Sequence, residues 1–198
     1  MKQIDWSQYI VDFSLHFDNL LNPWELPAQL ESIIHAKIAK LDSGYQTESN
    51  IAIHRDAVIE PGVVIKGPAI IGPNCFIGAH AYLRGGVWLE EQVLIGPGCE
   101  LKTSVVFSHS VIAHFNFIGD SLIGRNVNIE AGAVVANHFN ERSDKQITVR
   151  IAGNLIATGV VKFGALIGDG TKIGANAVLS PGTVLSPNTI VRRLELVE

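Results

Sequence analysis

The fold is decided by residues 51–101, which read IAIHRDAVIEPGVVIKGPAIIGPNCFIGAHAYLRGGVWLEEQVLIGPGCEL. Every sixth residue of this stretch is aliphatic, and the series is Ile53, Ile59, Ile65, Ile71, Ile77, Leu83, Leu89, Ile95 and Leu101. Neither the 3.6-residue period of a helix nor the alternation of an ordinary strand produces this spacing. A period of six is typical of a parallel β-helix, in which short strands stack into flat faces. We therefore expect an all-β solenoid.

The series continues beyond this stretch, with two five-residue steps and one interruption. Its later members are Val106, Ile112, Ile118, Ile123, Ile129, Val135, and then Ile167, Ile173, Leu179, Leu185 and Val191. The interruption covers about residues 138–165 and begins with a charged segment, residues 138–150. Long departures from a regular scaffold are often functional, so we expect an excursion loop here, followed by a short hairpin within residues 147–163.

The first fifty residues do not repeat. We expect residues 1–50 to form an α-helical N-terminal cap or extension and residues 51–198 to form the β-helix domain. Apolar residues at helical spacing predict one amphipathic helix over 9–21 and a second over 27–41. Because the terminal turns of a solenoid need a different cover, we expect these helices over its open end. A remnant of a larger fused ancestor is the alternative interpretation.

The composition narrows the possible partners. Of the 198 residues, 17% are charged, below the usual quarter, and the formal net charge is −4. A low charge density fits flat faces that pack against identical faces, so a homotrimer is the expected assembly. The acidic balance argues against a nucleic-acid partner. With no signal-peptide pattern and no apolar run long enough to span a bilayer, we expect a cytoplasmic protein with no membrane partner.

A second pattern consists of particular residues within 111–132, VIAHFNFIGDSLIGRNVNIEAG. Its members are Ala113, His114, Phe117, Ile118, Gly119, Asp120, and then Ile123, Gly124, Asn126, Asn128 and Ile129. Upstream, Arg84 stands in AYLRGG and Lys102 in CELKTS, and downstream Asn137 precedes the excursion. This arrangement resembles the acetyltransferase half of the bifunctional bacterial enzyme that makes UDP-N-acetylglucosamine. It also resembles the related archaeal-type sugar-1-phosphate nucleotidylyltransferases.

The resemblance runs from about residue 51 to 191 and implies a fold, an assembly and a reaction. The family is that of the hexapeptide-repeat acyltransferases, whose solenoid is a left-handed parallel β-helix and whose active sites lie between neighbouring copies of a homotrimer. The implied reaction moves an acetyl or other short acyl group from acetyl-CoA to an amino sugar, such as the sugar phosphate glucosamine 1-phosphate. No metal is expected for that reaction, which belongs to nucleotide-sugar metabolism.

The resemblance also assigns roles to individual residues. His114 is the general base, because an imidazole that titrates near neutral pH takes the proton that the attacking amine loses. Arg84 and Lys102 hold a phosphate dianion. The other residues implied to touch substrate or acyl donor are Glu100, Phe117, Asn128, Asn137 and, near the coenzyme, Ala175.

Each assignment has a structural alternative. His114 could serve trimer packing, and Arg84 and Lys102 could be solvated charges at the rim. Glu100 could be a salt-bridge partner, and the asparagines could occupy left-handed corners of the solenoid.

The sequence departs from the family pattern at several points. Phe117 replaces a tyrosine, His138 stands where a second tyrosine is usual, and Ala175 lies near a position that holds serine. The chain ends short of the family's last turn and tail, so we expect the acyl-donor site to be the least complete part. No Gly-rich loop ending in Arg-x-x-Pro-Lys precedes the repeats, so no nucleotidyltransferase domain is expected.

Two other functions remain open at this stage. The chain could be a non-catalytic trimeric sugar-phosphate-binding or scaffold protein that has lost the donor site. It could instead bind zinc, because His109, His114 and the more distant His80 loosely match the three-histidine layout of the β-helix carbonic anhydrases. Zn²⁺ held by three histidines would generate hydroxide near neutral pH.

Overall fold

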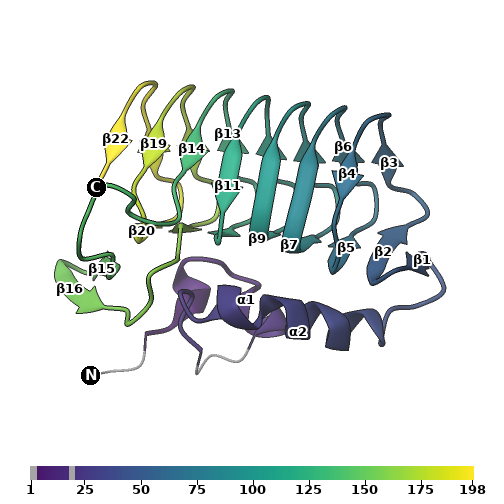
Figure 1. Ribbon diagram of the computed structural model, residues 1–198, viewed down its shortest axis with the longest axis horizontal. Helices are drawn as coiled ribbons and strands as arrows, with labels where there is room; N and C mark the ends of the chain where they lie inside the picture. Colours follow the sequence, from purple (N-terminus) through teal and green to yellow (C-terminus); the bar gives the residue numbers. More distant parts are fainter. Residues whose placement is uncertain (1–3, 18–20) are drawn as a thin grey trace.

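The computed structural model describes residues 4–17 and 21–198, and most of it is a parallel β-solenoid (Figure 1). Each strand pairs in register with the strand one turn later. Ile59 lies opposite Ile77, Ile77 opposite Ile95, and Ile95 opposite Ile112. The aliphatic residues of the six-residue series point inward and pack into one continuous core. The predicted all-β solenoid is confirmed.

The solenoid has three faces. The covered face contains β2 (Ile51–His54), β5 (Ala69–Ile71), the second halves of β7 (Tyr82–Leu89) and β9 (Glu100–Val106), β12 (Leu122–Ile123), β17 (Ala165–Ile167) and β20 (Thr183–Leu185). The front face contains β4 (Val64–Ile65), the first halves of β7 and β9, β11 (Phe117–Gly119), β14 (Val134–Val135), β19 (Val178–Leu179) and β22 (Leu196–Val197). Because β7 and β9 bend round the corner between these faces, they join both into one 13-stranded sheet.

The third face is a separate seven-stranded sheet. It contains β3 (Val58–Ile59), β6 (Phe76–Ile77), β8 (Leu94–Ile95), β10 (Val111–Ile112), β13 (Asn128–Ile129), β18 (Lys172–Ile173) and β21 (Ile190–Val191). At the first edge of the 13-stranded sheet, β1 (Tyr45–Glu48) pairs antiparallel with β2.

The N-terminal helices lie along the side of the solenoid (Figure 1), where we had expected them over its open end. They are a 3-10 helix η1 (Trp6–Gln8), α1 (Phe13–His16) and α2 (Leu26–Ile38), and α2 packs against β5, β7 and β9. The reason is that the outward side chains of the covered face are themselves apolar. A sheet that is apolar on both sides needs a cover on each. The buried outward residues are Ile70, Trp88, Val105, Leu122 and Leu166.

The second predicted helix is confirmed, and the first is not. α2 begins at Leu26 with Pro27 in its first turn. In place of a helix over 9–21, the described residues form only the four-residue α1, and residues 18–20 lie outside the described part. The solenoid competes for the backbone here: Asp169 donates its N–H to Tyr9 O at 2.9 Å and accepts the N–H of Val11 at 2.9 Å. Helix formation would have to give up these contacts.

The excursion contains the predicted hairpin. β15 (Thr148–Ile151) pairs antiparallel with β16 (Asn154–Ala157), and the buried side chains of Val149 and Ile151 attach it to the solenoid beside β20. The division into domains at residue 50 stays a prediction. Across residues 4–17 and 21–198, none of the helices has the length and apolar character needed to cross a membrane.

Candidate functional site

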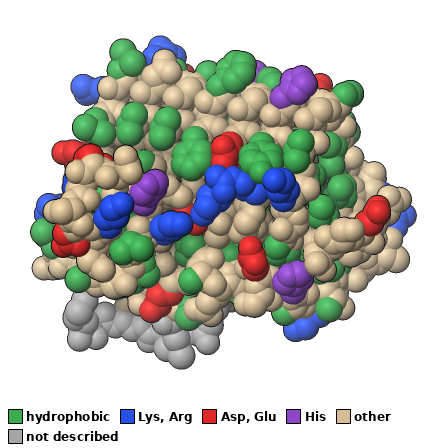
Figure 2. Space-filling view, viewed as in Figure 1, with side chains coloured by type: hydrophobic (Ala, Val, Ile, Leu, Met, Phe, Trp, Pro, Cys, Tyr) green, Lys and Arg blue, Asp and Glu red, His purple; other side chains and the backbone are tan. Residues whose placement is uncertain are grey.

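Two rows of outward side chains run along the front face. The first, here called the apolar row, contains Val64, Tyr82, Phe117, Val134, Val178 and Leu196, with Glu100 between Tyr82 and Phe117. The second, here called the cationic row, contains Lys66, Arg84 and Lys102 on three successive turns. Figure 2 shows green side chains above a blue band on this surface, with red atoms between two of the green side chains. Stacking of equivalent positions brings these residues together, although 18 positions separate neighbours in the cationic row.

The first pair in this region joins two predicted residues. Arg84, on β7, donates from Nε to Oε1 of Glu100 at 2.8 Å, and its Nη2 lies 2.7 Å from the same oxygen. Both side chains are about one-third exposed, at 37% and 34%. Glu100 is therefore a salt-bridge partner in this structure, which was the alternative interpretation of this residue. Because both side chains are partly exposed, a ligand can still reach the pair.

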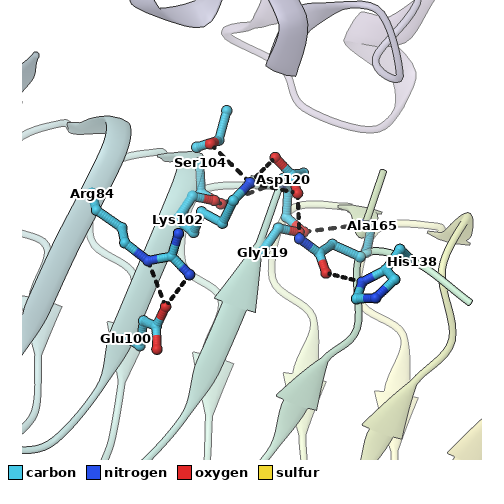
Figure 3. Close-up of polar contacts among 11 residues, drawn as sticks. Arg84, Glu100, Lys102, Ser104, Gly119, Asp120, His138 and Ala165 are labelled. Atoms are coloured by element: carbon cyan, nitrogen blue, oxygen red, sulfur yellow. Dashed lines mark hydrogen bonds and ion pairs between the residues drawn. The ribbon is translucent and has the colours of Figure 1, made fainter. Parts of the chain in front are cut away.

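A second, more buried network begins one turn further on (Figure 3). Lys102 Nζ lies 2.7 Å and 3.0 Å from the two carboxylate oxygens of Asp120, whose side chain is only 5% exposed. Asn137 donates its amide N–H to Oδ2 of Asp120, and its Oδ1 lies 3.2 Å from Nδ1 of His138. The predicted residue Asn137 thus positions Asp120, and it links the cationic row to the start of the excursion.

The backbone beside this network is in an unusual conformation. Thr103 and Asp120 occupy equivalent corners on successive turns with φ of 49° and 46°. Non-glycine residues rarely adopt the left-handed region, least of all a β-branched threonine, and such residues cluster at functional sites. The Thr103 hydroxyl accepts a hydrogen bond from Lys102 Nζ at 3.3 Å. The backbone conformation at this corner therefore places polar side chains around the Lys102 ammonium.

A pocket opens at the same corner, and the N-terminal segment forms one of its walls. Its floor includes Asp120 and Thr103, and the start of α2 faces them across the opening. The lining residues are Trp24, Pro27, Ala28, Glu31, Gly85, Thr103, Asp120, Gly159, Val160, Val161 and Lys162. This pocket joins three parts of the chain that are far apart in sequence.

His114 lies at the opposite corner of the front face, in the turn between β10 and β11. Its side chain is exposed, and within the described residues its ring forms no hydrogen bond or ion pair. A Cβ atom at Gly96 would lie 3.2 Å from His114 Nδ1 and would collide with the carbonyl of Ala113, so only glycine leaves this space to the ring. The ring nitrogens of His114 are therefore available to a ligand.

Two further predicted residues, Asn128 for substrate binding and Ala175 near the coenzyme, lie on another part of the solenoid. Asn128 is exposed on the seven-stranded face, opposite Lys172. Ala175 donates its N–H to Oε2 of Glu130 at 2.9 Å, and the Arg193 guanidinium, 2.8 Å from both carboxylate oxygens, lowers the pKa of Glu130 to about 2. A groove runs beside these residues, lined by Asn128, Glu130, Lys172, Ile173, Gly174, Ile190, Val191, Arg192 and Arg193.

The predicted residues thus fall into two groups within one chain. Arg84, Glu100, Lys102, Phe117 and Asn137 lie together on the front face, with His114 at its corner. Asn128 and Ala175 lie at the groove on the seven-stranded face.

The three histidines of the zinc hypothesis do not meet within one chain. His109 and His114 flank opposite ends of β10, and His80 occupies the same corner as His114 two turns earlier. In the described part of the chain, no group of three His, Cys, Asp or Glu side chains could hold a metal ion. A zinc site between copies stays a prediction.

Sequence reasoning missed three contributors to this region. Asp120 stood inside the quoted motif but received no role, although its position after a core aliphatic residue and glycine places it at a corner. Trp24 and Glu31 carry no signal in the sequence, because nothing in the repeat relates the N-terminal segment to the corner that it covers.

The six-residue repeat of this chain matches a known protein family. Residues 50–85 and 68–103 match the family described as bacterial transferase hexapeptide (six repeats). The chain is a hexapeptide-repeat protein. For this hexapeptide-repeat protein, the left-handed parallel β-helix class expected from the resemblance is confirmed.

Individual relatives carry the names that the resemblance implies. The chain is 31% identical over 176 residues to the bifunctional sugar-1-phosphate nucleotidylyltransferase/acetyltransferase of Sulfurisphaera tokodaii, covering 88% of this chain and 42% of that protein. It is 31% identical over 173 residues to the bifunctional protein GlmU of Methanococcus vannielii, covering 84% and 40%. With GlmU of Nitrosospira multiformis it shares 35% identity over 144 residues, covering 68% and 31%. The chain therefore spans about two fifths or less of the length of these curated relatives.

Proposed function

We propose that this protein transfers an acetyl or other short acyl group from acetyl-CoA to the amine of an amino sugar phosphate, such as glucosamine 1-phosphate. The observation that carries the proposal is the strip on the front face where Arg84, Glu100 and Lys102 lie side by side, with the free imidazole of His114 at its corner. The name of the Sulfurisphaera relative, which includes an acetyltransferase, supports it.

In this reaction the amine nitrogen attacks the thioester carbonyl, the new N–C bond forms, and the C–S bond breaks. The amine must be neutral when it attacks and must lose a proton as the intermediate forms. His114 accepts that proton and returns it to the departing thiolate. Much of the rate comes from holding amine and thioester together, since good alignment is worth roughly 7–11 kcal/mol.

The phosphate of the acceptor binds at Arg84 and Lys102. Both side chains have carboxylate partners in the structure, so phosphate binding requires them to share their donors between ligand and carboxylate. Arg84 has five N–H groups, enough for both partners, whereas the three N–H groups of Lys102 already face Asp120 and Thr103, so Lys102 must release one of these contacts to bind the phosphate. Glu100 lies beside Phe117 on the neighbouring strand and orients a sugar hydroxyl or the amine.

The acyl donor occupies the groove on the seven-stranded face. Lys172 and Arg192 line it together with Asn128, and their positive charges suit the phosphates of a coenzyme A thioester. Ala175 lies beside the groove through its bond to Glu130, and its small side chain leaves room for the pantetheine chain. Use of acetyl-CoA fits the cytoplasmic location expected from the sequence.

A homotrimer would bring the two groups of residues into one cleft between copies. Apolar side chains are exposed on both faces that the helices leave bare: Val64, Val178 and Leu196 on the front face, and Val58, Leu94 and Ile190 on the seven-stranded face. Exposed apolar side chains that gather on one face mark protein interfaces. Light scattering on the purified protein would measure a mass of three chains.

The decisive test is an acetylation assay with acetyl-CoA and glucosamine 1-phosphate, read from the released thiol. We expect His114→Ala to lower turnover by about 10²–10⁴-fold. His109→Ala is the matched control, because His109 also lies in a solenoid turn but at another corner, and we expect it to leave turnover unchanged. Unchanged turnover in a folded His114→Ala protein would contradict the proposed role.

A further inference from the structure

Three linked polar side chains lie where the N-terminal helices meet the covered face, and none of them has a role in the proposed acyl transfer. Glu90 follows β7, His16 ends α1, and Lys37 lies in the last turn of α2. His16 Nε2 is 2.5 Å from Oε1 of Glu90, and His16 Nδ1 is 2.9 Å from Lys37 Nζ. The other carboxylate oxygen of Glu90 accepts the N–H of Ser108 at 3.0 Å, which fixes the carboxylate beside the ring.

The order of these groups is that of an activated nucleophile. An ionised carboxylate only accepts hydrogen bonds, so the ring hydrogen lies on Nε2 of His16, and Nδ1 accepts from Lys37. The proton that Lys37 shares with Nδ1 can pass to the ring, because Glu90 stabilises the imidazolium that results. A side chain becomes a reactive nucleophile when a neighbouring base removes its proton and a third group orients that base.

The surroundings of Lys37 determine when its amine is neutral. Burial lowers the pKa of Lys37, while the negative charge of Glu90 opposes this shift and the positive charge of Lys40 adds to it. The Trp88 ring, whose centroid is 3.9 Å from Nζ, attracts the ammonium form through a cation–π contact. His16 is therefore the group that must take the proton before Lys37 can react.

Lys37 lines a pocket of about 360 Å³ between the helices and the solenoid. Among the described residues that line this pocket, Lys37 is the one lysine or arginine. Asp12, which pairs with Arg125, and the carboxylates of Glu90 and Glu91 line it too. Walls of this charge repel anions, so a neutral molecule with an apolar body suits the pocket best. Its apolar residues include Leu15, Leu41, Ile70 and Trp88.

We propose that Lys37 is a nucleophile that captures a neutral, apolar aldehyde as an imine, at a second reactive site distinct from the acyl-transfer site. The Nζ lone pair forms a bond to the carbonyl carbon, and the C=O bonding pair moves to the oxygen. The two hydrogens of the amine pass to that oxygen with His16 as the carrier, and the oxygen leaves as water when the C=N bond forms. Glu90 is a positioning residue, because it acts on Lys37 through His16.

Reductive trapping tests this inference without any acyl-transfer assay. The protein would be treated at neutral pH with hexanal and sodium cyanoborohydride, which reduces an imine to a stable secondary amine, and peptide mass spectrometry would locate the labelled lysines. Lys40, exposed just after α2, is the reference within the same molecule. We expect Lys37 to be labelled at least about 10-fold faster than Lys40, because an ordinary lysine is almost entirely protonated at neutral pH.

Two variants separate the role of His16 from that of the helix. His16→Phe keeps an aromatic ring against Trp88 but removes the proton acceptor, and it should lower the labelling rate of Lys37 to that of Lys40. His35→Phe, at an exposed position of α2, is the matched control and should leave the ratio of the two rates unchanged. Circular dichroism would check that both variants are folded.

The wild-type protein alone provides a further test. The ratio of the Lys37 rate to the Lys40 rate should fall as pH is raised toward about 10, because Lys40 then also loses its proton. Equal labelling of the two lysines at neutral pH, a ratio that does not change with pH, or a Lys37 rate that a folded His16→Phe protein retains would overturn the inference.

Discussion

The covered face and the front face are built from the same six-residue unit, yet the outer surface of the first is buried under the N-terminal helices and that of the second is bare. Both point an aliphatic residue inward at each turn, as at Leu83 and Leu89 of β7. On the covered face the outward neighbour is also apolar, as at Trp88, and the N-terminal helices bury it. On the front face the outward neighbours include Arg84 and Lys102. Inward residues therefore decide the fold, whereas outward residues decide what each face does.

The strongest test of this comparison is Trp88→Ala on the covered face. The ring is 4% exposed, packs edge-on against His16 at 4.8 Å, and carries Lys37 Nζ 3.9 Å above it. Removing a buried tryptophan typically costs about 3–5 kcal/mol of unfolding free energy. On the front face, Val178→Ala should cost about 1 kcal/mol or less. Equal losses of unfolding free energy from the two substitutions, measured by urea denaturation, would mean that outward side chains are no better buried on the covered face than on the front face.

A smaller loss of unfolding free energy is expected from Asp120→Asn. Comparison of this variant with Glu100→Gln distinguishes the two ion pairs of the front face. The change removes the charge partner of Lys102 while keeping the shape of the corner, and we expect a cost of about 1.5–3 kcal/mol in thermal or urea unfolding. Glu100→Gln breaks the pair with Arg84, which is one-third exposed, and should cost less than about 1 kcal/mol. A larger loss from Glu100→Gln than from Asp120→Asn would reverse our ranking of the two networks.

The smallest effect is expected at Glu130, in the exposed pair with Arg193. Because Arg193 lowers the pKa of Glu130 to about 2, below its ordinary value of 4.5, the pair stabilises the folded state above pH 4.5 and loses that contribution as pH falls toward 2. Glu130→Gln should therefore lower the melting temperature slightly at pH 7, and the difference from wild type should shrink as pH falls below 4.5. A difference that grows on acidification would contradict this assignment.

Much of the fold could be predicted because one period organises it. The series of inward aliphatic residues predicted the core, and the interruption after Val135 predicted the excursion and its hairpin. The sequence also indicates which face the N-terminal helices cover. Apolar residues occur there in pairs, such as Trp88-Leu89 and Val105-Val106, and one member of each pair points outward. The six-residue series contains only the inward member of each pair, so it does not reveal the outward apolar residues. The first helix failed for a different reason, since its backbone is held by Asp169 across 158 positions.

The candidate site also has one part that could be predicted from the sequence and one part that could not. Arg84 and Lys102 could be placed together because equivalent positions of successive turns stack, and the same logic would have placed Asp120 at the corner beside Thr103. The wall of the corner pocket could not be predicted. Trp24 and Glu31 reach it through the docking of a non-repeating segment, which depends on tertiary packing rather than on any period.

Calorimetric titration of acetyl-CoA, with and without glucosamine 1-phosphate, tests the central claim that the uncovered faces form an acyl-transfer site. We expect about one acetyl-CoA to bind per chain, and to bind more tightly when the sugar phosphate is present, because the proposed site holds donor and acceptor in one cleft. Absence of acetyl-CoA binding, with the sugar phosphate still bound, would contradict it and would identify a protein that binds sugar phosphates without catalysis.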